Sequence, residues 1–378
     1  MFDVHLSSCT HVEKREGLTM TKLRLMFNRS AVALLVSAGL IVVPATTSVA
    51  ATRPVGPVKA TITIAAVGSI DGTSFFTALH NGIFRQWGLN AKIVVEPTGV
   101  EVMNEIASGA ADFGDVGADP LLTAVAKGLP LKIIADNHGT ATLSYYAENQ
   151  AIVAGPRTGI TSIASLKGKK IGVALNTDAV GYLQSLLEQH HLSLNQVTLV
   201  NMTPADGVTA LARRSVDAIA TFEPWPSAAL LEVKGSRVVI EGHSKTWYDP
   251  GVIVSSESYL SAHPAVAEAF LGAVAQSENF VRSHLAQGAM IATQWITGLK
   301  AAVAKRAIKY VTFDMRMSKL VVEGLQHYMV PFLQKTGAIS GKFNVSSAMD
   351  TSYMVAVQKA RPQFFSGLPP IPSGDQLS

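Results

Sequence analysis

Residues 203–226, TPADGVTALARRSVDAIATFEPWP, contain in succession the signals of a short helix, a buried strand and an acidic turn. Thr203 is a favoured helix N-cap and is followed by proline, and Asp217 opens a strand of small apolar residues. The strand ends abruptly at a turn that holds Glu223 and Trp225. Because ligands bind at the carboxyl ends of strands in open α/β sheets, both residues are candidate ligand contacts.

The same pattern occurs about one hundred residues earlier in the chain. Thr98 opens a helical segment, Asp112 opens a buried strand, and the interval between them equals that in residues 203–217. This strand also ends at an acidic residue followed by proline, Asp119-Pro120. The repeat predicts two similar α/β lobes, each of which contributes a strand end to a shared cleft.

The first fifty residues have the features of an export leader. Basic residues follow Met20, an uncharged apolar run covers residues 31–43, and small residues precede a cleavage position after Ala50. The run is shorter than the roughly 20 residues that span a bilayer, although a membrane anchor is the alternative. We therefore expect a leader over 1–50 with its start at Met20, and a linker over 51–58.

The cysteine content and the charge of the chain argue against cysteine-based chemistry and against nucleic-acid binding. Cys9 is the only cysteine and lies in the leader, so the exported chain has no disulfide, cysteine nucleophile or thiolate metal site. No set of His, Asp and Glu has metal-ligand spacing, and no cofactor is expected. The leader holds five of the 31 Lys and Arg and three of the 27 Asp and Glu, so the formal charge of +4 falls to about +2 without it. The basic residues are scattered, which argues against nucleic-acid binding.

Strand and helix patterns alternate along most of the chain, which predicts an α/β fold with largely parallel sheets covered by helices on both faces. The segment 249–256 is expected to return as a strand to the first lobe, and mostly helices are expected after it. Residues 368–378 are expected to be flexible. The predicted bounds are 59–145 plus 251–378 for the first lobe and 146–250 for the second.

Five phrases, in this order, resemble the solute-binding proteins of bacterial ABC importers, specifically the nitrate, sulfonate, taurine and thiamine-precursor group. They are HNGIFRQWGLN (80–90), EIASGAADFGDVGADP (105–120), SIASLKGKKIGV (162–173), SVDAIATFEPW (215–225) and HPAVAEAFLGAVA (263–275). The resemblance implies a type II periplasmic binding protein, in which two lobes joined by two crossovers close on the ligand. It also implies a monomer in the periplasm that delivers a small solute to a membrane permease with its ATPase, and no enzymatic activity.

The predicted cleft is placed by the strand ends and by the helix starts near Thr73 and Thr177, whose free N–H groups suit an anionic group. Simple helix capping is the alternative for several of these residues, a structural role is the alternative for His138, and packing is the alternative for Trp225. The candidate ligand-binding residues are Ser69, Asp71, Thr73, Ser74, Gly117, Asp119, Asn137, His138, Asn176, Thr177, Asp178, Glu223 and Trp225.

The predicted cleft loops contain no Lys or Arg, whereas each carries at least one Asp or Glu. A bare anion such as nitrate gains from a guanidinium, so this composition favours a zwitterion or an amine-bearing ring. An aliphatic sulfonate of the taurine class fits the resemblance, and a thiamine-precursor pyrimidine or nitrate is the alternative. Enzymes that resemble this fold include a sulfinate desulfinase that uses a cysteine, which the exported chain lacks. A sensor-linked binding domain is a further alternative.

Overall fold

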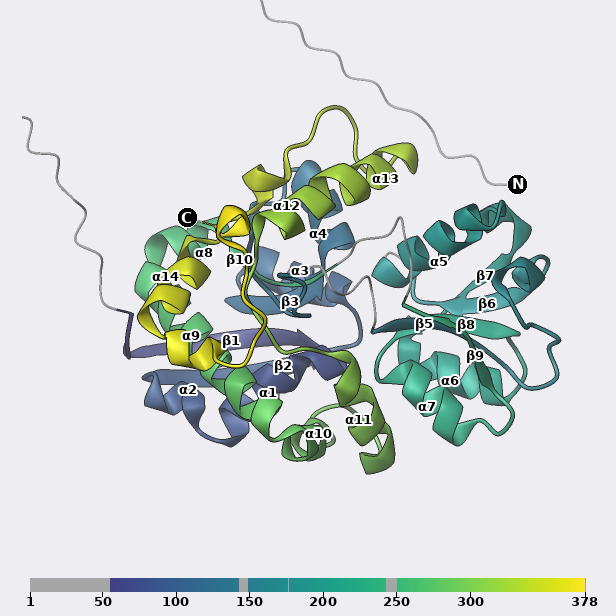
Figure 1. The fold of residues 1–378 in the computed structure, drawn as a ribbon, viewed down its shortest axis with the longest axis horizontal. Coiled ribbons are helices and arrows are strands. Elements are labelled where there is room, and N and C mark those ends of the chain that lie inside the picture. The colour runs from purple at the N-terminus through teal and green to yellow at the C-terminus, as the bar shows by residue number, and fades with distance from the viewer. Residues whose placement is uncertain (1–54, 143–148, 176, 243–249, 378) are drawn as a thin grey trace, which may run out of the picture. The chain divides into compact units, whose positions relative to one another are not determined.

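The computed structural model describes residues 55–142, 149–175, 177–242 and 250–377, and the chain from Arg53 to Ser378 forms one compact unit. Two sheets organise this unit (Figure 1). The expected leader, the linker up to residue 54 and the candidate Asn176 lie outside the described residues.

The first sheet has five strands in the order β2-β1-β3-β10-β4. Its members are β1 (Ala60–Val67), β2 (Leu89–Glu96), β3 (Phe113–Gly117), β4 (Leu131–Asp136) and β10 (Gly251–Ser256). Strand β1 is parallel to β2 and β3, whereas β10 is antiparallel to both of its neighbours. The prediction that the 249–256 segment returns to the first sheet is therefore confirmed.

The second sheet repeats this arrangement with the order β7-β6-β8-β5-β9. Its members are β5 (Gln150–Ala154), β6 (Lys170–Val173), β7 (Thr198–Asn201), β8 (Ala218–Phe222) and β9 (Arg237–Glu241). Strand β6 is parallel to β7 and β8, and β5 is antiparallel to β8 and β9. The predicted α/β class with two mostly parallel sheets is confirmed. In chain order β4 of the first sheet is followed by β5 of the second, and β9 of the second by β10 of the first. Residues 143–148 and 243–249 lie outside the described residues, so the lobe bounds stay a prediction.

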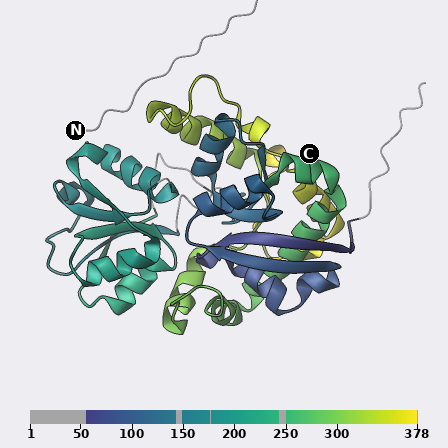
Figure 2. The same ribbon diagram turned by 180° about the vertical axis from the view of Figure 1, so that it is seen from behind.

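Helices flank both sheets. In the second sheet, α5 (Asp178–Gln189) covers one face, and α6 (Pro204–Ala212) and α7 (Trp225–Glu232) cover the other (Figure 1 and Figure 2). The remaining helices are α1 (Thr73–His80), α2 (Ile83–Gln86), α3 (Gly99–Ser108), α4 (Ala118–Ala126), α8 (Glu257–Ala262), α9 (Pro264–Ser283), α10 (Leu285–Ala292), α11 (Ala301–Ala307), α12 (Lys319–Gly324), α13 (Val330–Lys335) and α14 (Ser352–Ala360). None of the helices in the described ranges combines the length and the apolar character needed to cross a membrane.

The repeated aspartates hold equivalent places in the two sheets. The Asp112 N–H donates to the Thr63 carbonyl at 2.9 Å, and the Asp112 carboxylate accepts from the Thr63 N–H at 2.8 Å. Asp217 makes the same two bonds with Lys170, each at 2.8 Å. Each aspartate thus joins the start of a central strand, β3 or β8, to its parallel neighbour, in the middle of β1 and at the first residue of β6.

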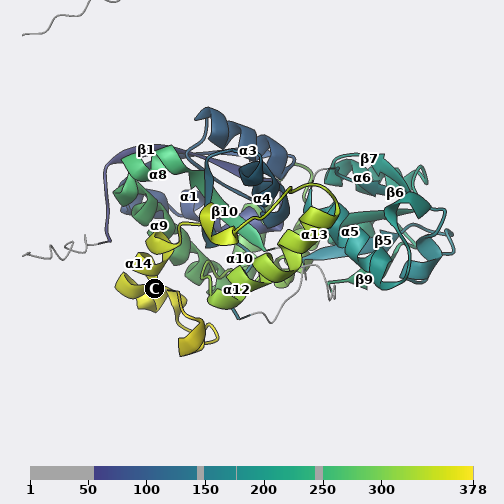
Figure 3. The same ribbon diagram turned by 90° about the horizontal axis from the view of Figure 1, so that it is seen from above.

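The C-terminal helices contact both halves of the unit. Lys335 on α13 pairs with Glu188 on α5 at 2.7 Å, and Figure 3 shows these two helices side by side. The prediction of a flexible C-terminal end is wrong over its described part. Ile371 is buried, and the Arg316 guanidinium donates to the Pro369 carbonyl at 2.9 Å. The buried Arg316–Asp314 pair fixes the direction of that guanidinium.

Candidate ligand-binding site

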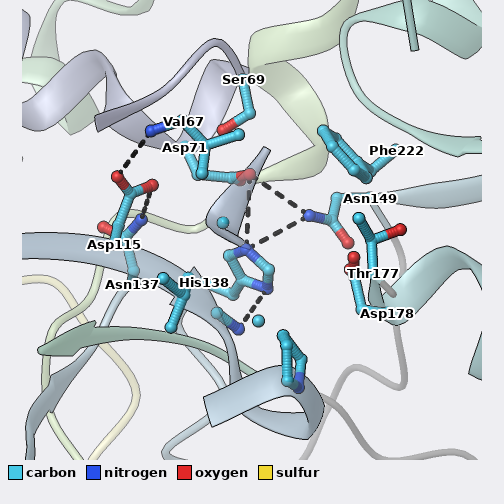
Figure 4. Close-up of a pocket in the computed structure, with 15 residues that line it drawn as sticks. Val67, Ser69, Asp71, Asp115, Asn137, His138, Asn149, Thr177, Asp178 and Phe222 are labelled. Atoms are coloured by element: carbon cyan, nitrogen blue, oxygen red, sulfur yellow. Dashed lines mark hydrogen bonds and ion pairs between the residues drawn. The ribbon is translucent and has the colours of Figure 1, made fainter. Parts of the chain in front are cut away.

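A cavity of about 40 Å³ lies where strand ends of the two sheets meet (Figure 4). Small-molecule sites commonly enclose several hundred Å³, so a ligand requires this cavity to widen. Its lining consists of Val67, Ser69, Asp71, Gly99, Asp115, Val116, Gly117, Pro120, Asn137, His138, Asn149, Thr177, Asp178, Phe222 and Gly251. No Lys or Arg is among these residues.

Asp71 and His138 form one polar pair of the cavity (Figure 4). Asp71 lies in the turn before α1, and its Oδ2 is 3.3 Å from His138 Nε2. Asn149, just before β5, donates to the same oxygen at 3.4 Å, so residues near both sheets meet at one carboxylate. The Gly251 N–H donates to His138 Nδ1 at 2.7 Å. A nitrogen that accepts this bond carries no proton, so the geometry gives a neutral imidazole that donates from Nε2.

The electrostatic surroundings of His138 oppose this neutral form. Burial by itself lowers the pKa of His138, but the nearby carboxylates Asp71, Asp136 and Asp178 outweigh it and raise the pKa to about 9. The imidazolium needs a proton on Nδ1, where the Gly251 N–H is aimed. His138 therefore gains a proton only when its bond to the first residue of β10 breaks. In this conformation the bond of 2.7 Å from the Gly251 N–H to Nδ1 favours the neutral form.

Asp115 is a buried carboxylate inside β3 rather than at its end. It accepts from the Val67 N–H at 3.0 Å and from the Asn137 amide at 3.3 Å. Burial raises the pKa of Asp115 to about 7. The second oxygen of Asp71 and the amide oxygen of Asn137 are buried without a hydrogen-bond partner among the described residues. The unmatched polar atoms of the cavity are therefore acceptors, which require donors from a ligand or from water.

Thr177 and Asp178 form the wall contributed by α5. Thr177 is the helix N-cap, and its hydroxyl donates to the Ala174 carbonyl at 2.8 Å. The Asp178 carboxylate accepts from the Gln150 amide, and burial raises the pKa of Asp178 to about 6. Nearby, Asp136 accepts from the N–H groups of His138 and Gly139 at 2.6 and 2.9 Å, which holds the loop after β4 in place.

The structure brings seven of the predicted site residues together in this cavity: Ser69, Asp71, Gly117, Asn137, His138, Thr177 and Asp178. Thr73 and Ser74 do not line it. Both are fully buried at the start of α1, and the Thr73 hydroxyl donates to the Ile70 carbonyl at 2.6 Å. Asp119 borders a neighbouring cavity instead.

Glu223 and Trp225 also lie outside the cavity lining. Glu223 is only 1% exposed, and its carboxylate accepts from the Ser227 hydroxyl at 2.8 Å and from the Ser227 N–H at 3.3 Å. It therefore caps the first turn of α7, and its burial raises its pKa to about 7. Trp225 borders a third cavity beside Ile296. Glu223 does lie at the predicted strand end, but its side chain turns back onto α7 and away from the cavity.

Sequence reasoning missed four notable lining residues: Asp115, Asn149, Phe222 and Gly251. Asp115 had a signal, since it is a carboxylate within a strand of apolar and small residues. Asn149 and Gly251 border the segments between the sheets and carry no local signal. The described residues contain no group of three or more His, Cys, Asp or Glu that could hold a metal ion.

Known proteins resemble this chain in sequence. It is 26% identical over 285 residues to the putative aliphatic sulfonates-binding protein of Bacillus subtilis (strain 168), covering 75% of this chain and 82% of the relative. It is 25% identical over 175 residues to the taurine-binding periplasmic protein of Escherichia coli (strain K12), covering 46% and 52%. These named relatives are binding proteins.

Solved structures share the fold at lower identity. The alkanesulfonate-binding protein SsuA from Xanthomonas axonopodis pv. citri has a TM-score of 0.66 at 22% identity, covering 77% of this chain and 98% of that one. The desulfurization enzyme DSZB has a TM-score of 0.59 at 13% identity, covering 80% and 99%. The family model described as NMT1/THI5 like matches residues 69–286, which include both sheets' central strands and the whole cavity lining except Val67. The chain belongs to the NMT1/THI5-like family.

Proposed function

We propose that this protein is the substrate-binding component of an ABC importer and captures a small organic solute that carries a cationic, donor-bearing group. The sulfonate-binding and taurine-binding relatives support the receptor role. On this proposal the protein acts as a monomer in the periplasm after removal of its leader, performs no chemistry, and delivers the solute to a permease with its ATPase. Two lobes, 59–145 plus 251–378 and 146–250, would close on the solute by a hinge motion.

The observation that carries the solute class is the balance of donors and acceptors in the cavity. Among the residues that the structure describes, Asp71, Asp115 and Asp178 line it and no Lys or Arg does, and the unmatched buried atoms of this lining belong to Asp71 and Asn137. Buried carboxylates without a cationic partner are costly, and a ligand ammonium would offset that cost. An inorganic anion alone would add a further negative charge. Nitrate is therefore the least favoured of the alternatives.

An aminosulfonate of the taurine class fits this arrangement best. Its ammonium would meet Asp71 and Asp115, and its sulfonate would lie toward the start of α5 at Thr177, where helix N–H groups favour negative charge. A thiamine-precursor pyrimidine is a second candidate, because Phe222 lines the cavity and could stack on a ring whose amino group reaches the carboxylates.

Calorimetry on the exported form with matched two-carbon probes tests the proposal. Taurine has both groups, ethanesulfonate lacks the amine, and ethylamine lacks the sulfonate. We expect taurine to bind, ethylamine to bind more weakly, and ethanesulfonate to bind weakest. An aminopyrimidine in the same series tests the second candidate. Equal binding of taurine and ethanesulfonate would remove the carboxylates from ligand recognition.

A further inference from the structure

A second cavity adjoins the first. It has a volume of about 660 Å³, and Pro120 and Thr177 line both cavities. Pro120 lies near the start of α4 and Thr177 at the start of α5, so the boundary between the cavities is made by two helix starts, one from each sheet's layer. The two spaces are therefore neighbours across a pair of side chains.

The two cavities differ in chemistry. The first is lined by carboxylates, amides and an imidazole. The second has apolar side chains from three helices and a loop, Val100, Met103, Leu129, Val180, Phe332 and Leu333, and its lining also includes Asp119, Lys127 and Gln184. Helix α13, which carries Phe332 and Leu333, is joined to α5 by the Lys335–Glu188 ion pair at 2.7 Å. The apolar space thus has helix α13 as one wall and the polar cavity as its neighbour.

We propose that the solute is amphiphilic: its donor-bearing head occupies the polar cavity, and an apolar chain or ring extends between Pro120 and Thr177 into the second cavity. This inference rests on the proposed function and extends it to the part of the solute remote from the charge. A two-carbon solute such as taurine would then fill only the first compartment. Longer solutes would gain affinity by burying apolar surface against Met103 and Val180.

A chain-length series tests this proposal by calorimetry. The probes are n-alkylamines from ethylamine to octylamine, with n-alkylsulfonates of the same lengths as a parallel series. Each methylene that leaves water contributes about 0.8 kcal/mol, so affinity should rise about fourfold per added methylene until the cavity is filled. Head-group preference between the two series reports on the proposed function. Dependence on length within one series reports on the second cavity.

Two variants fill the second cavity from two different helices. Ala124→Trp acts from α4 and Val180→Trp acts from α5, and neither residue lines the polar cavity. Both should flatten the dependence on chain length while keeping the affinity for ethylamine. Leu231→Trp is the control, since Leu231 is 53% exposed on α7 and should leave the series unchanged.

The outcomes separate the two proposals. Affinity that does not change with chain length in the unaltered protein would overturn the apolar compartment and leave the receptor role intact. A rise with length that persists in both tryptophan variants would overturn it as well. Failure of every member of both series to bind, at any length, would instead overturn the proposed solute class.

Discussion

The two copies of the repeat share one pair of aspartate hydrogen bonds to a neighbouring strand, called the aspartate joint below, but differ in the residues that follow it. Asp112 and Asp217 make matching pairs of hydrogen bonds to a neighbouring strand. Three positions later, β3 carries the buried carboxylate Asp115 and β8 carries Ala220. At the strand ends, Glu223 caps its own helix, whereas Asp119 borders the apolar cavity. The aspartate joint occurs in both copies because each holds two parallel strands together. The residues that line the polar cavity are not repeated.

This difference makes the polar cavity asymmetric. The first sheet and its loops contribute Asp71, Asp115 and His138, while the second contributes an N-cap threonine, Asp178 and Phe222. A carboxylate in place of Ala220 as well would add a further buried charge without a partner. On the proposed function, the first sheet and its loops therefore supply two of the three carboxylates that would face a cation, and the second sheet and its helices supply Asp178, a helix start and a ring.

Removing a carboxylate of the first lobe should have the largest effect. Asp71→Asn and Asp115→Asn should each weaken taurine binding by roughly 30-fold to several thousand-fold, since loss of one partner of a buried charged pair costs about 2–5 kcal/mol. Glu223→Gln is the matched control and should change affinity by less than about threefold, because its carboxylate faces Ser227. Calorimetry measures all three. A large effect of Glu223→Gln with a small effect of Asp115→Asn would place the site in the second lobe instead.

The pH dependence of stability should reflect Asp115. Its pKa is raised by burial from 3.8 to about 7, so the folded state favours the protonated acid, and the free energy of unfolding falls as pH rises from about 4 to about 7. Between pH 5 and 7 this amounts to about 2–3 kcal/mol. Asp115→Asn should remove this part of the slope and stabilise the unliganded protein at pH 8. Denaturant unfolding at pH 5, 7 and 8 measures it, and an unchanged slope in the variant contradicts it.

The aspartate joints at Asp112 and Asp217 should contribute different amounts to the free energy of unfolding. Asp112→Ala should lower the free energy of unfolding by about 1–2 kcal/mol, and Asp217→Ala by about 0.5–1 kcal/mol, because the Asp112 bond is partly buried and the Asp217 bond is exposed. Asparagine at either position keeps an acceptor and should recover most of the loss. Urea titration of the four variants checks the order. Equal losses would mean that burial does not decide the strength of these bonds.

Effects of similar size but opposite sign should come from the residue eleven positions after each N-cap threonine. Gly109 has φ +76° and Arg214 has φ +59°, so both adopt the left-handed conformation. Side chains other than glycine are strained there, so Arg214→Gly should raise the free energy of unfolding by about 0.5 kcal/mol and Gly109→Ala should lower it by about 1 kcal/mol. A Cβ at Gly109 meets no atom within 4 Å, so the cost is conformational alone. Thermal unfolding of both variants tests the opposite signs.

Local chemistry was enough to predict the architecture from the sequence. Thr98 and Thr203 accept hydrogen bonds from the N–H groups of Val100 and Asp206, as N-caps should. The strands of both copies form, and the two sheets share one order of equivalent strands. The caps and the strands depend on residues close together in the chain, whereas the order of the strands depends on pairing between distant segments.

Tertiary structure alone decided which polar groups face the cavity. Glu223 lies at the predicted strand end, yet its carboxylate bonds Ser227, and Asp115 faces the cavity from within a strand. The neutral state of His138 depends on Gly251, 113 residues away. The direction of a side chain depends on which partner satisfies its polar atoms, and these partners come from elements that the fold brings together. The sequence by itself therefore determined the sheets and their repeat, whereas distant hydrogen-bond partners determined the site.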